Sequence, residues 1–193
     1  MMMLTIGFVS GFLVADGSML KAYNDSFDKY NIENGNFRTA EKVYRSQWKD
    51  IEAFGVKLYE NFYIEEELDN GSTMRFFRNR EQVNKVCLME GEMPEGEDEI
   101  AIDRMYADNN NLKVGDTIDD GTKSWKITGL VALSDYSCLF QNNSDSMFDA
   151  VKFGVAIMTE EGADQFGTTH LEYRYSWQYA NEPKDDIEAK NMS

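Results

Sequence analysis

The sequence is poor in the residues that most catalytic and metal sites need. It has a single histidine, His170, and two cysteines, Cys87 and Cys138, in 193 residues. The cysteines lie 51 positions apart without metal-like spacing, which argues against a zinc site. A disulfide between them would suit an extracellular location, but we expect two free, partly buried thiols.

Basic residues are also scarce. The chain has 19 lysines and arginines against 35 acidic residues, and its formal net charge is −16. Because binding to phosphates requires a basic face, this balance argues against a nucleic-acid partner. The same charge would repel anionic lipid headgroups. A soluble, solvated surface is the simplest interpretation.

No nucleophile or nucleotide motif is present. A Ser-His-Asp or Cys-His arrangement would have to use His170, and no Gly-x-Ser-x-Gly turn accompanies it. Neither a phosphate loop nor a Gly-x-Gly-x-x-Gly pattern occurs. Residues 108–111 and 116–121 are rich in oxygen ligands but lack the order of an EF-hand, and turn formation explains both. We therefore predict no catalytic, cofactor-binding or metal-binding residues.

The chain has enough apolar residues for a substantial core. Hydrophobic residues make up 42% and aromatic residues 13% of the sequence, which excludes a disordered chain. Helical and strand patterns are mixed without regular βαβ alternation, so we predict an α+β fold. It should have mixed or antiparallel sheets, a few short helices and two lobes.

One stretch, residues 91–131, organises the rest. It predicts a turn at Gly91–Pro94, a buried strand at Glu99–Asp103, a short helix over 104–110 and a hairpin. The hairpin joins 113–118 to 124–131 through the turn residues 119–121.

The other elements follow from local patterns. We expect a helix capped by Thr39, with Trp48, Ile51 and Phe54 on one face and its end at Gly55. A helical stripe before it should break at Asn34–Asn36. The remaining predictions are strands at 56–64, 74–78, 83–89, 150–158 and 173–179, a hairpin turn at 69–71, and a helix from Thr159 to Gly167.

Four aromatic residues alternate along one face of the last strand: Tyr173, Tyr175, Trp177 and Tyr179. Such a face could stack against sugar rings or bases. More often it belongs to the core, which is the interpretation we favour.

The first 15 residues carry no charge. A membrane span needs about 20 apolar residues, so this run is short for one, and it lacks the basic start of a secretory signal. A buried helix, an unusual signal core and the outer end of a transmembrane helix remain open, and we favour the last.

The order of several short motifs resembles the extracytoplasmic domain of FtsX-like and MacB-like ABC-transporter permeases. These motifs are Gly91-x-x-Pro94, Asp98–Asp103, Ala107, Leu112–Asp116 and Trp125–Val131. The segments Tyr30–Phe37, Ala132–Tyr136 and Tyr175–Tyr179 look like the version found in Gram-positive anaerobes. The resemblance runs from about Phe8 to the chain end.

The resemblance implies a non-catalytic domain of a dimeric permease in the cell membrane, on its extracellular side. A cytoplasmic ABC ATPase would drive the permease, and the domain would pass motion to an extracellular peptide, lipoprotein or cell-wall partner. Residues 1–15 would then end the first transmembrane helix, 16–180 would form the MacB-like periplasmic core domain, and 181–193 would begin the helix that leads to the next span. The alternatives are a secreted module that binds cell-wall glycan or calcium and, with only its acidic residues in favour, a secreted hydrolase.

Overall fold

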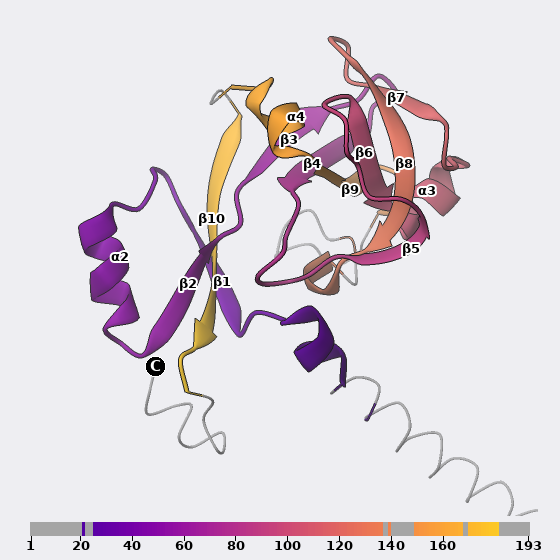
Figure 1. Cartoon of the computed structure of the whole chain (residues 1–193). Coiled ribbons are helices and arrows are strands. Elements are labelled where there is room, and N and C mark those ends of the chain that lie inside the picture. The colour runs from indigo at the N-terminus through magenta and orange to yellow at the C-terminus, as the bar shows by residue number, and fades with distance from the viewer. Residues whose placement is uncertain (1–20, 22–24, 137–138, 140–148, 168–169, 182–193) are drawn as a thin grey trace, which may run out of the picture.

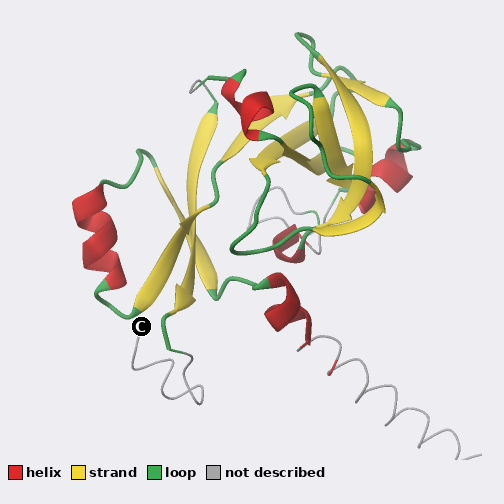
Figure 2. Cartoon of the chain, viewed as in Figure 1, coloured by secondary structure: helices red, strands yellow, loops and turns green. Residues whose placement is uncertain are grey.

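The computed structural model describes residues 21, 25–136, 139, 149–167 and 170–181. These residues form a ten-stranded mixed sheet with short helices, which confirms the α+β prediction (Figure 2). The strands are β1 (Gly35–Thr39), β2 (Val56–Glu60), β3 (Tyr63–Glu67), β4 (Thr73–Arg78), β5 (Cys87–Gly91), β6 (Glu99–Asp103), β7 (Thr117–Asp119), β8 (Ser124–Ala132), β9 (Phe153–Met158) and β10 (Leu171–Tyr179). The helices are α2 (Arg45–Glu52), α3 (Arg104–Asn110) and α4 (Glu160–Asp164), with the 3-10 turn η1 (Ser134–Tyr136) and helical residues 25–30.

The long strand β10 joins two lobes (Figure 1). The small lobe contains β1, α2 and β2, and both of its strands pair antiparallel with β10. The large lobe runs from β10 through β3, β4, β9, β6 and β8 to β5, with β7 also on β8. The β4–β9 and β6–β8 pairs are parallel and the other pairs are antiparallel.

The core lies in the large lobe. All six residues of β9 are buried, and so are four of the five in β6. Phe76 of β4 packs against Trp125 of β8 and Phe166, with ring centroids 5.6 and 5.5 Å away, and those two rings stack on each other at 5.3 Å. Strands buried on both faces require the continuous apolar runs found at Ile100–Ile102 and in β9.

The stretch from residue 91 to 131 forms the predicted strand, helix and hairpin, but Gly91 ends β5 instead of opening a turn, and the first hairpin strand covers only Thr117–Asp119. The buried strand β6 leads into α3, whose N-cap Asp103 accepts hydrogen bonds from the backbone N–H groups of Met105 and Tyr106. The hairpin of β7 and β8 turns at Gly121, where φ is +81°. A positive φ favours glycine, so the Asp-Asp-Gly turn specifies this hairpin locally.

Two glycines allow β5 to lie close against β8. Gly91 is opposite Gly129 in the ladder, and Gly91 has φ of +73°. A Cβ atom on Gly91 would overlap the carbonyl oxygen of Thr128, and one on Gly129 would overlap that of Glu92. The backbones therefore approach more closely than any side chain permits.

The predicted helix of the small lobe exists but begins later than expected. Thr39 ends β1, and the N-cap of α2 is Tyr44. None of the residues within α2 is fully buried, and Phe54 is 77% exposed. The expected apolar face thus packs only in part against the sheet.

Two further boundaries differ from the prediction. The 56–64 strand is two strands, β2 and β3, interrupted at Asn61 and Phe62, because the chain passes there from the small lobe to the large lobe. The first helix ends at Asn31, with φ of +49°, and Gly35 and Asn36 belong to β1 instead of breaking the helix. The strand expected at 83–89 begins later, as β5 at Cys87.

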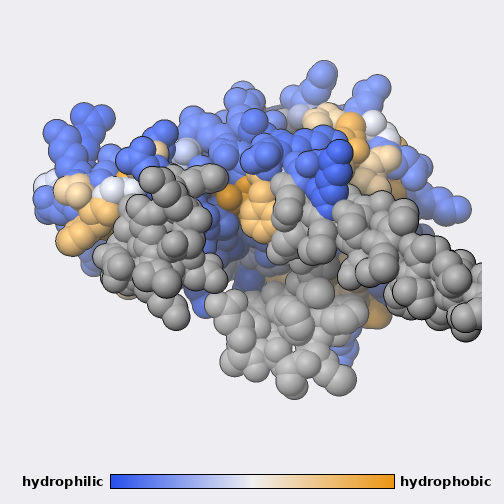
Figure 3. All heavy atoms as spheres, turned by 90° about the horizontal axis from the view of Figure 1, so that it is seen from below, coloured by the Kyte–Doolittle hydropathy of each residue, from blue (hydrophilic) through white to orange (hydrophobic). Residues whose placement is uncertain are grey.

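Within the described residues, no helix is both long and apolar enough to cross a membrane. The segments predicted to join transmembrane helices, 1–15 and nearly all of 181–193, lie outside the described residues. The described residues that are visible in Figure 3 are mostly hydrophilic, with separate hydrophobic areas among them. Large exposed apolar side chains include Tyr44 and Phe54 beside α2, and Leu88 and Met89 on β5.

Candidate functional site

The linker segment, residues 30–34, leads from the first helix into β1 and is held by the large lobe. The backbone N–H of Asn84 donates to the carbonyl oxygen of Asn31 at 3.0 Å. Glu33 and Asn84 are joined twice: Glu33 N–H donates to Asn84 Oδ1 at 2.9 Å, and Asn84 Nδ2 donates to Glu33 Oε2 at 2.6 Å. Asn84 is fully buried, so these bonds are shielded from water.

The same segment is also held by the end of β10. The N–H of Asn34 donates to the carbonyl oxygen of Trp177 at 3.0 Å, and the N–H of Tyr179 donates to Asn34 Oδ1 at 3.0 Å. Gln178 Nε2 donates to Asn31 Oδ1 at 2.9 Å. The linker segment is therefore bonded to both the loop after β4 and the last strand.

Behind the linker segment lie four buried charges, the junction cluster: Glu33, Arg80, Asp135 and Arg174. Their side chains are 7%, 5%, 3% and 9% exposed, in that order. Arg80 Nη1 donates to Asp135 Oδ1 at 2.7 Å, and Arg174 Nη2 donates to Glu33 Oε1 at 3.1 Å. Arg174 Nη1 lies 3.4 Å from Asp135 Oδ2. Two positive and two negative charges thus compensate each other at the point where the lobes meet.

The Tyr136 hydroxyl binds two arginines of the large lobe and β10. Arg174 Nη1 donates to it at 3.1 Å and Arg75 Nη1 at 3.3 Å. Burial alone would lower the pKa of Arg174, but Tyr136, Asp135 and Glu33 outweigh this effect and raise that pKa above its ordinary value. Both arginines therefore stay charged in the interior.

Hydrogen bonding at this junction is incomplete. Buried side-chain atoms without a hydrogen-bond partner, among the described residues, are Asn61 Oδ1, Arg80 Nε, Arg80 Nη2, Ser134 Oγ, Asp135 Oδ2 and Arg174 Nε. All belong to the junction cluster or to residues next to it in sequence, except Asn61, whose Nδ2 donates to Ser176 Oγ on β10. Buried polar groups usually have partners, so the junction departs from the usual pattern.

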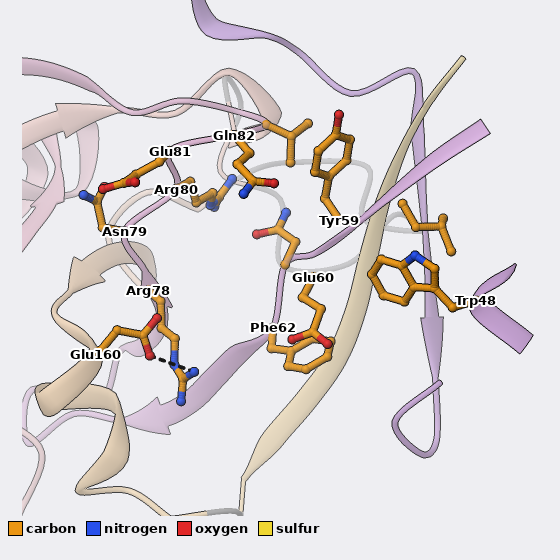
Figure 4. A pocket seen from close by; sticks show the side chains of 13 residues that line it. Trp48, Tyr59, Glu60, Phe62, Arg78, Asn79, Arg80, Glu81, Gln82 and Glu160 are labelled. Atoms are coloured by element: carbon orange, nitrogen blue, oxygen red, sulfur yellow. Dashed lines mark ion pairs between the residues drawn. The ribbon is translucent and has the colours of Figure 1, made fainter. Parts of the chain in front are cut away.

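A cavity of about 640 Å³, the interlobe cavity, is lined in part by Arg80 of the junction cluster (Figure 4). It is lined by residues 58–62 on the small-lobe side and by residues 78–83, which begin at the last residue of β4, together with Trp48 of α2 and Glu160 of α4. Arg80 and Asn61 belong to both the cavity lining and the group with unpartnered atoms. The sequence did not predict the junction cluster, because its members are far apart in the chain: Glu33 and Arg174 are separated by 141 positions.

The aromatic face of β10 packs largely against other rings of the chain. Tyr175 is fully buried, and the other three aromatic residues are half-buried. Phe37 stacks on Tyr175 at 5.4 Å, and Trp48 and Phe62 meet its ring edge-on at 5.8 and 5.2 Å. The core interpretation is correct at Tyr175.

The two oxygen-rich loops use their side chains within the fold. Asp120 accepts hydrogen bonds from the backbone of Thr122 and Lys123 and from Trp125 Nε1 at 2.8 Å. Asn110 Nδ2 donates to the carbonyl oxygen of Tyr106 at 3.0 Å. No group of three or more potential metal ligands occurs in the described part of the chain.

His170 and Cys87 do not belong to the junction cluster. His170 is exposed and its Nδ1 lies 2.6 Å from Glu66 Oε1. Cys87 is a half-buried free thiol that accepts a hydrogen bond from the Tyr30 hydroxyl at 3.0 Å. Cys138 lies outside the described residues.

No family model and no curated protein matches the sequence. Solved structures with a similar fold include the periplasmic region of MacB from Actinobacillus actinomycetemcomitans, which is 8% identical with a TM-score of 0.42. That match covers 81% of this chain and 78% of the other. The extracellular domain of the noncanonic ABC-type transporter YknZ from Gram-positive bacteria is 12% identical, with a TM-score of 0.41, and the match covers 81% and 86%.

Proposed function

We propose that this chain is a non-catalytic extracytoplasmic domain of an ABC-transporter permease of the FtsX-like and MacB-like type. In this proposal a cytoplasmic ATPase drives a permease dimer, and the domain passes the movement of transmembrane helices to an extracellular peptide, lipoprotein or cell-wall partner. In this proposal residues 1–15 are the outer end of one transmembrane helix, and residues 181–193 begin the helix that leads to the next span.

One observation supports this proposal most: the linker segment is bonded both to the large lobe and to the end of β10. The chain that enters the domain at 30–34 and the chain that leaves it at 177–179 lie side by side. Two transmembrane helices attached at these points would therefore act on the same place. Because Glu33 and Asn84 are buried and doubly hydrogen-bonded, movement of the linker segment would carry the large lobe with it.

The test is to uncouple the linker segment in the intact permease with its ATPase. Pairs of spectroscopic labels, with one label at exposed Lys57 or Lys113 and the other in the membrane-embedded part, report movement of each lobe during ATP hydrolysis. The variant Asn84→Ala removes both hydrogen bonds, and Glu33→Gln removes the negative charge that pairs with Arg174. We expect ATP hydrolysis to persist while the ATP-dependent movement at Lys113 is reduced.

The matched control is Asn79→Ala, which changes an exposed amide outside the linker contacts. It should leave both hydrolysis and movement unchanged. If the wild-type domain shows no ATP-dependent movement, or if Glu33→Gln and Asn84→Ala move as the wild type does, the proposed coupling is wrong.

A further inference from the structure

The interlobe cavity has the size of a small-molecule site. Its volume of about 640 Å³ falls within the range of roughly 300–1,000 Å³ that is typical of ligand pockets. Residues of both lobes form its walls. A ligand there would bridge the lobes.

Arg80 lines this cavity and has a pair of hydrogen-bond donors that are buried beneath its surface and unused within the described residues. Its Nη1 is committed to Asp135, and its guanidinium carbon lies 4.0 Å from the centre of the Phe77 ring, which fixes the plane. The buried Nε and Nη2 atoms have no hydrogen-bond partner within the described residues. These two atoms form one edge of the guanidinium, and their parallel N–H groups match the two oxygens of a carboxylate.

Asn61 presents the complementary group, an unused acceptor. This residue is only 4% exposed, and its Nδ2 donates to Ser176 Oγ at 3.0 Å. Its Oδ1 has no donor among the described residues. An N–H group of a ligand would satisfy this oxygen, whereas an apolar group would leave it unpaired.

The charges at the rim favour a ligand that also carries a positive group. Three glutamates line the cavity; Glu60 pairs with Lys42 at 3.0 Å and Glu160 with Arg78 at 2.9 Å. Glu81 is exposed and makes no ion pair within the described part of the chain. A purely anionic ligand such as phosphate would meet this carboxylate, while an ammonium group would neutralise it.

We propose that the interlobe cavity binds a small zwitterion, an α-amino acid or a dipeptide. The carboxylate would bind the Nε and Nη2 edge of Arg80, an N–H group would donate to Asn61 Oδ1, and the ammonium group would lie near Glu81. Leu58 and Phe62 offer an apolar wall for the side chain. Because the Arg80 atoms are covered in the structure, the 79–83 loop shifts as the ligand enters.

This inference goes beyond the proposed permease role and does not depend on it. A zwitterion site could exist in a secreted protein, and a permease domain could lack one. The binding experiment uses the full 193-residue chain and the coupling experiment uses the intact permease, so the failure of one is distinguishable from the failure of the other.

Isothermal titration calorimetry tests the ligand class with free amino acids and dipeptides at up to about 10 mM, enough to detect a weak site. Each ligand that binds is compared with its C-terminal amide and its N-acetyl form, and phosphate and glucose are added as other classes. We expect saturable binding of at least one free zwitterion. Both of its blocked forms should bind with an affinity at least about tenfold lower. No binding in the panel, equal binding of the amide, or binding of phosphate or glucose alone overturns the proposal.

Substitutions then locate the site. Glu81→Gln changes an exposed side chain, so the melting temperature should stay constant while binding weakens about fivefold or more. Glu90→Gln on β5 is the matched control and should bind as the wild type does. Arg80→Lys keeps a charge beside Asp135 but removes the donor edge, and in folded protein it should abolish binding. Unchanged binding by Glu81→Gln or by folded Arg80→Lys refutes the site.

Discussion

The core of the large lobe and the junction cluster are both buried, yet different forces hold them. In the core, Phe76, Ile102 and Val155 are almost entirely excluded from water and pack against other apolar groups. At the junction, buried arginines and carboxylates pair, and several of their atoms lack hydrogen bonds. Apolar burial is non-directional and stabilises a rigid lobe. A buried charge cluster depends on geometry, so a small displacement changes its energy strongly.

The largest effect should come from a cavity in the core. Phe76→Ala removes a ring that is 1% exposed, and we expect a loss of about 3–5 kcal/mol in the free energy of unfolding. Urea denaturation followed by circular dichroism measures it. Phe54→Ala, where the ring is 77% exposed, should cost about 0.5 kcal/mol or less. Similar losses for both variants would contradict the assignment of the core to the large lobe.

Arg174→Met should have the next largest effect, because it leaves Glu33 and Asp135 without their shared partner. We expect the free energy of unfolding to fall by about 3 kcal/mol. The exposed Arg45→Met is the matched control and should change little. In Arg174→Met, hydrogen exchange should show that the backbone amides of Asn84 and Tyr179 lose protection while those of β6 keep it. Uniform loss of protection would show that the junction and the core unfold as one unit.

The glycines of the organising stretch should differ from one another. Gly91→Ala places a methyl group against Thr128 at a positive φ, and we expect a loss of about 2 kcal/mol. Gly115→Ala also has a positive φ, +98°, but nothing lies within 4 Å of its Cβ, so about 1 kcal/mol is expected from backbone strain alone. Thermal melting of the two variants compares them. Equal losses of stability in the two variants would mean that the close approach of β5 to β8 does not contribute to the cost of Gly91→Ala.

Replacement of Glu99 should have the smallest effect on stability, and this effect should depend on pH. Its carboxylate accepts hydrogen bonds from the N–H groups of Glu95 and Gly96 and pairs with Lys126, which lowers the pKa of Glu99 below its ordinary value of 4.5. The contribution is therefore present above about pH 4.5 and is lost as the pH falls through the folded-state pKa. Near neutral pH, Glu99→Gln should have a lower melting temperature than the wild type. This difference in melting temperature should vanish in acid. A difference that is constant with pH would disprove this cause.

The sequence predicted the parts of the fold that local chemistry determines. The strand and helix of residues 99–110, the β7–β8 hairpin and the Thr159-capped helix follow from apolar runs, caps and turn glycines. The break between β2 and β3 at Asn61 and the strand β1 were missed, because pairing with the distant β10 determines both.

The junction cluster could not be predicted for the same reason. Its residues come from four separate segments, and an acidic chain offers many possible partners for each arginine. The one available signal was Glu33 within the Tyr30–Phe37 segment, which the resemblance to permease domains marked as a match. That signal gave no indication of burial, and only the tertiary structure shows that Glu33 contacts Arg174.

The most direct test of the account is to purify the product of the intact gene from membranes and ask what accompanies it. The account predicts that this chain occurs in a membrane-embedded permease and that an ATP-hydrolysing subunit copurifies with it. Recovery of the protein in soluble form outside the membrane, or from membranes without any ATP-hydrolysing subunit, would contradict the proposed function.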